Sequence, residues 1–255
     1  MTLRLEIAGA VAVLTIDRPE KRNAMSFEMW SALPGLLGKV DADDSVRALV
    51  IRGNDHFSAG ADISEFTTLR ADPAGARRYG AAVHDGERSI AGLSKPTIAA
   101  ITGVCVGGGC EIALACDVRI AAVDARFGIT PAKLGIVYNA TSTKRLVDAV
   151  GPSWARQILF TAELVDAATA LRIGLVNELH PAEEVVARGL ALAETMASRA
   201  QVSVRGAKAI IDRVTEGHLD LDTDEAVHAL HEASVTSADY AEGVRAFLEK
   251  RPPRF

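Results

Sequence analysis

Two glycine-rich segments and one acidic residue are the parts of this 255-residue sequence best suited to chemistry. The first segment reads HFSAGADI at residues 56–63, and the second reads ITGVCVGGGCE at residues 101–111. Small residues let a ligand approach the backbone closely, and N–H groups at a helix start can bind an anion or a developing oxyanion. Both segments lack the GxxxxGKS/T and GxGxxG patterns of phosphate loops. We therefore expect an anion or oxyanion site made of backbone N–H groups.

Glu111 follows the second segment directly and is the strongest candidate for acid or base chemistry. If a helix begins near Gly108, the Glu111 side chain lies in its first turn and leans back toward the N-terminus. It would then face whatever the glycine N–H groups bind. A first-turn acid also complements the helix dipole without any catalytic role. The sequence alone leaves both interpretations open.

Short apolar runs rich in branched residues predict the strands that must carry these segments. They lie at residues 11–16, 46–51, 97–101 and 118–121. The intervening stretches are long enough for helices, which predicts a β/α layout. After Phe127, strand-like runs nearly vanish apart from residues 175–179, and the chain from about residue 180 is predicted to be mainly helical.

Two helices are predicted between these strands. One covers residues 26–40 with Ser26 as a plausible N-cap, and Pro34 and Gly35 should kink or break it. The other covers residues 74–93.

Composition and charge exclude several classes of protein. With 49% apolar and 24% charged residues and a net charge of −5, the chain is typical of a soluble globular protein and offers no general attraction to nucleic acid. Residues 96–116 are long enough to span a bilayer, but three consecutive glycines and a carboxylate would be costly there. We expect a buried strand and helix instead, with no membrane partner.

Three cysteines, Cys105, Cys110 and Cys116, have spacings that match no common zinc pattern. We expect them to be buried and reduced, and we expect no metal site. Their odd number and the absence of a credible export signal favour a reducing compartment, the cytoplasm.

Several separated motifs resemble the enoyl-CoA hydratase/isomerase family, also called the crotonase family. They are FSAGADI at residues 57–63, KPTIAAITG at 95–103 and GGGCEIALACD at 107–117. Residues 17–19 (DRP) and 23–26 (NAMS) resemble the first loop of the family, and residues 247–251 (FLEKR) resemble its C-terminal signature. The resemblance extends from about residue 7 to residue 255.

The resemblance implies an α/β fold, a crotonase-like spiral of ββα units followed by a helical C-terminal trimerisation region. We assign residues 1–195 to the spiral core and residues 196–255 to the helical oligomerisation region. The implied assembly is a homotrimer or a dimer of trimers. The implied ligand is an acyl-CoA substrate, with coenzyme A as part of that substrate and no separate cofactor.

The resemblance also implies roles for individual residues. The N–H groups of Ala61 and Gly108 match those that hold the thioester carbonyl oxygen and stabilise an enolate, and Glu111 matches an acid/base. The residues that match the CoA-binding segments are Ala24, Ala59, Asp62 and Ile63. Phe247 and Lys250 match positions that reach the CoA of a neighbouring subunit.

One position departs from the hydratase pattern. Hydratases of this family use two glutamates, one matching Glu111 and the other about twenty residues later, where this chain has Pro131. Because proline can neither donate nor accept a proton, water addition would depend on Glu111 alone or on a group from elsewhere. The isomerase branch keeps the second acid and lacks the first, so that pattern fails as well.

A second branch of the family is also similar. TPAKLGIVYN at residues 130–139, FTA at 160–162 and ADYAEG at 238–243 resemble methylmalonyl-CoA decarboxylase, which places a tyrosine matching Tyr138 near the acyl carboxylate. That branch has a histidine where this chain has Ala61. Tyr138 also fits an ordinary residue of a pocket wall. The hydratase interpretation therefore has two alternatives, a decarboxylase and a non-catalytic paralogue that binds acyl-CoA.

Overall fold

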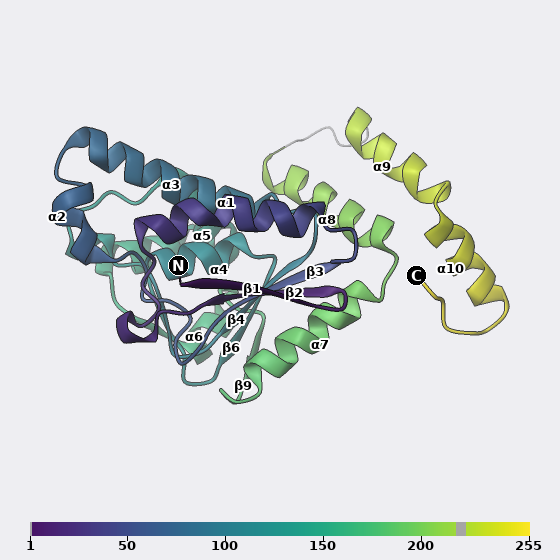
Figure 1. Ribbon diagram of the computed structural model, residues 1–255, viewed down its shortest axis with the longest axis horizontal. Helices are drawn as coiled ribbons and strands as arrows, with labels where there is room; N and C mark the ends of the chain where they lie inside the picture. Colours follow the sequence, from purple (N-terminus) through teal and green to yellow (C-terminus); the bar gives the residue numbers. More distant parts are fainter. Residues whose placement is uncertain (1, 218–222) are drawn as a thin grey trace.

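The computed structural model describes residues 2–217 and 223–255, and its centre is a six-stranded sheet (Figure 1). The strand order is β1-β2-β3-β4-β6-β9. The first strand pairs antiparallel with the second, and all the other neighbours are parallel. Their bounds are β1 (Leu3–Ala8), β2 (Val11–Ile16), β3 (Ala48–Gly53), β4 (Thr97–Ile101), β6 (Val118–Ala122) and β9 (Glu178–His180).

The structure also contains a smaller sheet of three strands. It contains β5 (Val104–Val106), β7 (Arg126–Gly128) and β8 (Val165–Asp166). The chain passes from β4 into β5 and from β6 into β7. From β4 to β7, successive strands therefore alternate between the two sheets, and this alternation agrees with the expected spiral of ββα units.

Helices cover both faces of the large sheet. The helices α1 (Phe27–Ala42) and α3 (Pro73–Ala91) pack against each other on one side, and α7 (Val185–Ala197) packs against β2, β3, β4 and β6 on the other (Figure 1). Strands buried on both faces read as continuous apolar runs, and β4 is buried along its whole length. The α/β architecture predicted from the sequence is confirmed.

The strands that the sequence predicted correctly are the interior strands of the large sheet. The predictions at residues 11–16 and 97–101 agree with β2 and β4, and those at 46–51 and 118–121 are displaced or shortened by one or two residues relative to β3 and β6. The edge strand β1 was missed because Arg4 and Glu6 interrupt its apolar pattern and only Leu3 is buried. Of the run at residues 175–179, only the end is strand, in β9.

The first helix begins as predicted but does not break. Ser26 caps α1, because its Oγ accepts a hydrogen bond of 3.2 Å from the N–H of Met29. The prediction was a kink or a break at Pro34 and Gly35, and the break is wrong, since one helix runs from Phe27 to Ala42. Proline removes one backbone hydrogen bond inside a helix. Here the buried side chains of Trp30 and Leu37, on either side of Pro34, hold both halves against the core.

The remaining helices are mostly short or lie toward the C-terminus. The short ones before α7 are η1 (Pro19–Lys21), η2 (Ile63–Glu65), α2 (Phe66–Leu69), α4 (Gly108–Ala115), η3 (Pro131–Lys133) and α6 (Ala167–Arg172). One long helix, α5 (Ala140–Thr161), also precedes α7 and contains a kink at Gly151. Those after α7 are α8 (Gln201–Thr215), α9 (Glu225–Val235) and α10 (Ala238–Leu248). The helical C-terminal part is thus confirmed.

The last two helices, α9 and α10, form an arm that extends away from the sheet (Figure 1). Residues 218–222 of the predicted oligomerisation region lie outside the described residues. The boundary at residues 195 and 196 stays a prediction, and it falls within the last turn of α7.

The apolar segment at residues 96–116 folds into β4, β5 and the whole of α4. In the parts of the chain that are described, no helix is long and apolar enough to cross a membrane. The three cysteines of residues 96–116 are buried free thiols, as predicted, and the Sγ atoms of Cys105 and Cys110 lie 3.9 Å apart.

Candidate active site

The two glycine-rich segments lie side by side because backbone hydrogen bonds join them. The N–H of Ser58 donates to the carbonyl of Val104 at 3.0 Å, and the N–H of Val106 donates back to the carbonyl of Ser58 at 2.9 Å. The chain then turns at Gly60 with φ 95° and at Gly107 with φ 52°. Only glycine adopts such values without strain, so these residues set where the following N–H groups point.

The N–H groups of Ala61 and Gly108 border one small space. A Cβ added to Gly60 would lie 3.0 Å from the nitrogen of Gly108, and a Cβ added to Gly108 would lie 3.5 Å from the nitrogen of Ala61. On the other edge of this segment, Met25 pairs with the carbonyl of Gly60 and the N–H of Asp62. Neither the Ala61 nor the Gly108 N–H donates to another group in residues 2–217 and 223–255. Two convergent free donors are the arrangement that an oxyanion requires.

Glu111 lies in the first turn of α4, which begins at Gly108 as predicted. Its side chain is only 8% exposed, and its Oε1 accepts a hydrogen bond of 3.3 Å from Asn139 Nδ2. Burial, reinforced by the negative charge of Glu87, raises the pKa of Glu111 to about 8. A helix dipole favours the charged form by about 0.3–1 kcal/mol, which is less than one pKa unit. Burial therefore prevails, and Glu111 is mostly protonated at neutral pH.

A cavity of about 510 Å³ joins Glu111 to the two free N–H groups. Its wall includes Ala61, Gly108, Tyr138 and Pro131, so the position of the missing second acid faces the same space as Glu111. Most of the other lining side chains are apolar, and they stand beside a few ionisable ones. These other lining residues include Ile63, Phe66, Arg70, Tyr79, Val83, His84, Lys133, Leu134, Ile136 and Val137.

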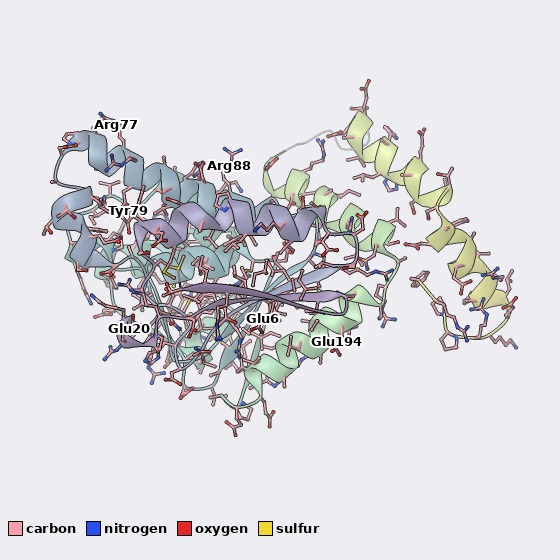
Figure 2. The ribbon with its side chains drawn as sticks, in the orientation of Figure 1. Glu6, Glu20, Arg77, Tyr79, Arg88 and Glu194 are labelled. Atoms are coloured by element: carbon pink, nitrogen blue, oxygen red, sulfur yellow. The ribbon has the colours of Figure 1, made fainter. Side chains whose placement is uncertain are left out.

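Tyr138 places its hydroxyl in the buried part of this wall. The hydroxyl is buried beside the Glu111 carboxyl, and burial raises the pKa of Tyr138 well above its usual value. Tyr79 also faces inward, whereas Arg77 and Arg88 project outward from the same helix, α3 (Figure 2). The inner side of α3 is therefore part of the site.

The four residues predicted to bind CoA near the first segment fall into two groups. Ala59 and Ile63 line the cavity. Ala24 is buried in the preceding loop, and the Asp62 carboxylate binds Arg18 Nη1 at 2.7 Å and Ser64 Oγ at 2.6 Å. The Asp62 side chain thus ties two loops together, and its contact with CoA stays a prediction.

Phe247 and Lys250 lie elsewhere. Phe247 is in α10, where 83% of its side chain is exposed, and Lys250 is exposed just beyond the helix end. This arm is at the opposite end of the molecule from α2 (Figure 1). These residues therefore do not reach the cavity of their own chain.

A buried network around Glu87 was not predicted. Glu87 has no exposed surface, and its Oε2 accepts hydrogen bonds from Ser142 Oγ at 2.7 Å and Arg145 Nη1 at 2.9 Å. Its Oε1 is 3.5 Å from Asn139 Nδ2, the atom that also binds Glu111. A sequence signal existed, because Glu87 shares the apolar face of residues 74–93 with Tyr79 and Ile90. A single carboxylate on such a face indicates a buried charge with a partner.

Substitution of Glu111 by glutamine is expected to stabilise the protein at alkaline pH. Between the ordinary glutamate pKa of 4.5 and the folded-state pKa of about 8, the folded chain holds a proton that the unfolded chain has lost. The stability from Glu111 is thus present below about pH 4.5 and is lost as pH rises through 8. The free energy of unfolding of Glu111→Gln relative to the wild type should rise by about 2–4 kcal/mol between pH 5 and pH 8. Denaturant titrations at both pH values measure this, and a difference that is independent of pH would contradict it.

Known proteins resemble this chain over its whole length. The enoyl-CoA hydratase/isomerase family matches residues 6–255. A crotonyl-CoA hydratase of Syntrophomonas wolfei is 38% identical, with 98% of this chain and 96% of that protein covered, and a short-chain-enoyl-CoA hydratase of Clostridium acetobutylicum is 37% identical, with 97% and 94% covered. The crystal structure of an enoyl-CoA hydratase/isomerase family protein from Hyphomonas neptunium superimposes with a TM-score of 0.97 at 39% identity, covering 100% of this chain and 97% of that one.

These matches bear on two predictions made from the sequence. The resemblance to the enoyl-CoA hydratase/isomerase family and the crotonase-like fold are confirmed. The matches give no support to a particular likeness to methylmalonyl-CoA decarboxylase, since both curated relatives named above are hydratases.

Proposed function

The chain belongs to the enoyl-CoA hydratase/isomerase family, and on that basis we propose that it adds water to the double bond of a short 2-enoyl-CoA thioester. It is an enzyme that acts on acyl-CoA thioesters. The observation that carries the proposal is the single cavity that contains the Ala61 and Gly108 N–H groups and the buried Glu111 carboxyl. The names of the two curated hydratases support a short acyl chain.

The two N–H groups stabilise the negative charge that water addition creates. The thioester carbonyl oxygen accepts hydrogen bonds from Ala61 and Gly108. When the oxygen of water bonds to Cβ, the electrons of the double bond move toward that carbonyl and form an enolate. Preorganised donors in a buried site bind this charge more strongly than they bind the neutral thioester, and this difference lowers the barrier.

Glu111 supplies and recovers the proton. In its protonated form, one carboxyl oxygen accepts a proton from the attacking water while the other gives its own proton to Cα. The hydroxyl adds to Cβ, and Glu111 ends the step protonated, so one carboxyl serves both ends of the double bond. This mechanism fits the raised pKa of Glu111 and needs no acid at Pro131.

Turnover of a panel of thioesters tests the proposed function. Crotonyl-CoA should lose the absorbance of its conjugated thioester and yield 3-hydroxybutyryl-CoA, and the hydroxyacyl compound should give the reverse reaction. A malonyl-type thioester is the third arm. Release of CO₂ from that compound without hydration of crotonyl-CoA would overturn the hydratase proposal in favour of a decarboxylase, and binding without turnover of any compound would favour a non-catalytic paralogue.

The assembly that we propose is a homotrimer or a dimer of trimers held by the C-terminal helices. Apolar side chains are exposed on α8 and α10, including Ile211, Val214, Phe247 and Leu248, and a cavity of about 380 Å³ lies between α8, α9, α10 and Phe255. A neighbouring subunit that covers this surface would also bring Phe247 and Lys250 to a second CoA. Sedimentation should therefore give a trimer or a hexamer, and a monomer at micromolar concentration would contradict both the assembly and the role of Lys250.

A further inference from the structure

Glu87 shares a hydrogen-bond donor, the side-chain amide of Asn139, with the reacting carboxyl of Glu111. It comes from α3, whereas Glu111 comes from α4 and Asn139 from the loop before α5. The Asn139 amide nitrogen lies 3.3 Å from Glu111 Oε1 and 3.5 Å from Glu87 Oε1. Because an amide NH₂ has two hydrogens, it can donate to both carboxyls at once. The two carboxyls are thus held on either side of one donor.

We propose that Glu87 is a positioning residue for Glu111: it shares the Asn139 amide with Glu111, and its negative charge holds the proton on Glu111. This inference rests on the proposed hydratase function, in which Glu111 enters the reaction as an acid. The second carboxylate of this site thereby comes from α3 and acts through Glu111. It does not replace the missing acid at Pro131 as a direct proton donor.

The surroundings of the two carboxyls decide which of them keeps the proton. Glu87 accepts hydrogen bonds from Ser142 and the Arg145 guanidinium, and His84 lies one turn before it on the same helix. Burial raises the pKa of Glu87, and these groups oppose that effect by favouring its ionised form. Glu111 faces the phenols of Tyr138 and Tyr79 and is farther from the Arg145 charge. Two adjacent buried carboxyls rarely ionise together, so the proton belongs on Glu111.

The Asn139 side chain is itself fixed in place. Its Oδ1 accepts a hydrogen bond of 2.8 Å from the N–H of Ser142 and caps α5. The same first turns of α5 carry Ser142 and Arg145 toward Glu87. One helix start therefore orients the amide that binds both carboxyls and the groups that keep Glu87 ionised.

The test measures the protonation of Glu111 directly in Glu87→Gln. Infrared difference spectra over a pH titration show the C=O band of a protonated carboxyl, and its absence from Glu111→Gln identifies the band of Glu111. The midpoint for Glu111 should fall by at least about one pH unit in Glu87→Gln, because a neighbouring negative charge is lost. Asp85→Asn is the matched control, since it removes one negative charge from an exposed position of the same helix. It should leave the midpoint unchanged.

Kinetics supply the second readout. With crotonyl-CoA, Glu87→Gln should lose about fivefold or more in kcat at pH 8 but stay within about threefold of the wild type at pH 6, where Glu111 is protonated in both enzymes. KM should change by less than about threefold, because the N–H groups that hold the thioester are untouched. Loss of kcat by the same factor at pH 6 and pH 8 would overturn the inference.

A second variant covers the case in which Glu87→Gln does not fold. Ser142→Ala removes a donor to Glu87, makes that carboxylate less acidic and should lower the Glu111 midpoint in the same direction. A folded variant of either kind whose Glu111 midpoint equals that of the wild type would overturn the inference. If the wild type fails to hydrate any enoyl-CoA, the proposed function fails, while the infrared titration still decides the role of Glu87.

Discussion

Glu111→Gln is expected to slow the hydration of crotonyl-CoA by about 10²–10⁴-fold, the range for a positioned acid/base. Glutamine keeps the shape of the side chain and a contact with Asn139 Nδ2, but it cannot pass a proton from water to Cα. KM and CoA binding should change little, since the cavity and its N–H groups remain. Initial rates at several substrate concentrations separate the two effects.

Glu28→Gln is the matched control for this variant. Glu28 is also an acid in the first turn of a helix, α1, but it is exposed. If Glu111 served its helix dipole alone, the two substitutions would have similar small effects on stability, about 0.3–1 kcal/mol, and none on turnover. A loss of less than about threefold in kcat for Glu111→Gln would return Glu111 to that role. Melting curves of both variants at pH 5 accompany the rates, because the stability effect of Glu111 grows with pH.

Gly108→Ala is expected to lower kcat/KM by about 10²–10³-fold, the effect of losing one oxyanion donor. The new Cβ would lie 3.5 Å from the nitrogen of Ala61 and 3.5 Å from Glu111 Oε2, so it would fill the space where the thioester oxygen binds. It would also lie 2.8 Å from Cζ2 of Trp30, a fully buried side chain. Overpacking of this kind costs about 1–3 kcal/mol, so rates must be measured well below the melting temperature.

Gly38→Ala provides the comparison. Gly38 lies within α1, and a Cβ there would meet nothing within 4 Å. This variant should keep wild-type kcat/KM and gain slightly in stability, because alanine favours a helix over glycine by about 1 kcal/mol. Wild-type kcat/KM in Gly108→Ala would show that the thioester oxygen does not bind between Ala61 and Gly108.

The local features of this protein could be predicted from its sequence. Residues 11–16 and 97–101 form strands because branched apolar side chains favour extended backbone inside a sheet. Ser26 begins a helix because its hydroxyl satisfies a free N–H, and α4 begins at Gly108, which places Glu111 in the first turn. Each of these signals acts within a few residues, and so it can be found without knowing the rest of the fold.

Contacts between distant segments were decided by the tertiary structure. Pro34 was expected to kink or break α1, but the helix continues past it, because burial of Trp30 and Leu37 outweighs one lost hydrogen bond. Glu87 is 24 residues before Glu111 on another helix, and its side chain meets Glu111 only because α3 packs against α4. Proline at position 131 was visible in the sequence, whereas the meeting of Glu87 with Glu111 was not.

The sequence by itself determined where an oxyanion site and an acid could form, because glycine conformations and a first-turn position follow from local residue types. The tertiary structure decided that the acid is buried, that its pKa is raised to about 8 and that Asn139 joins it to a second carboxylate. These properties depend on how much water remains around a group and on which charges lie within a few ångströms of it. Both are set by the packing of helices that are remote in the chain, and no local pattern of residues specifies them.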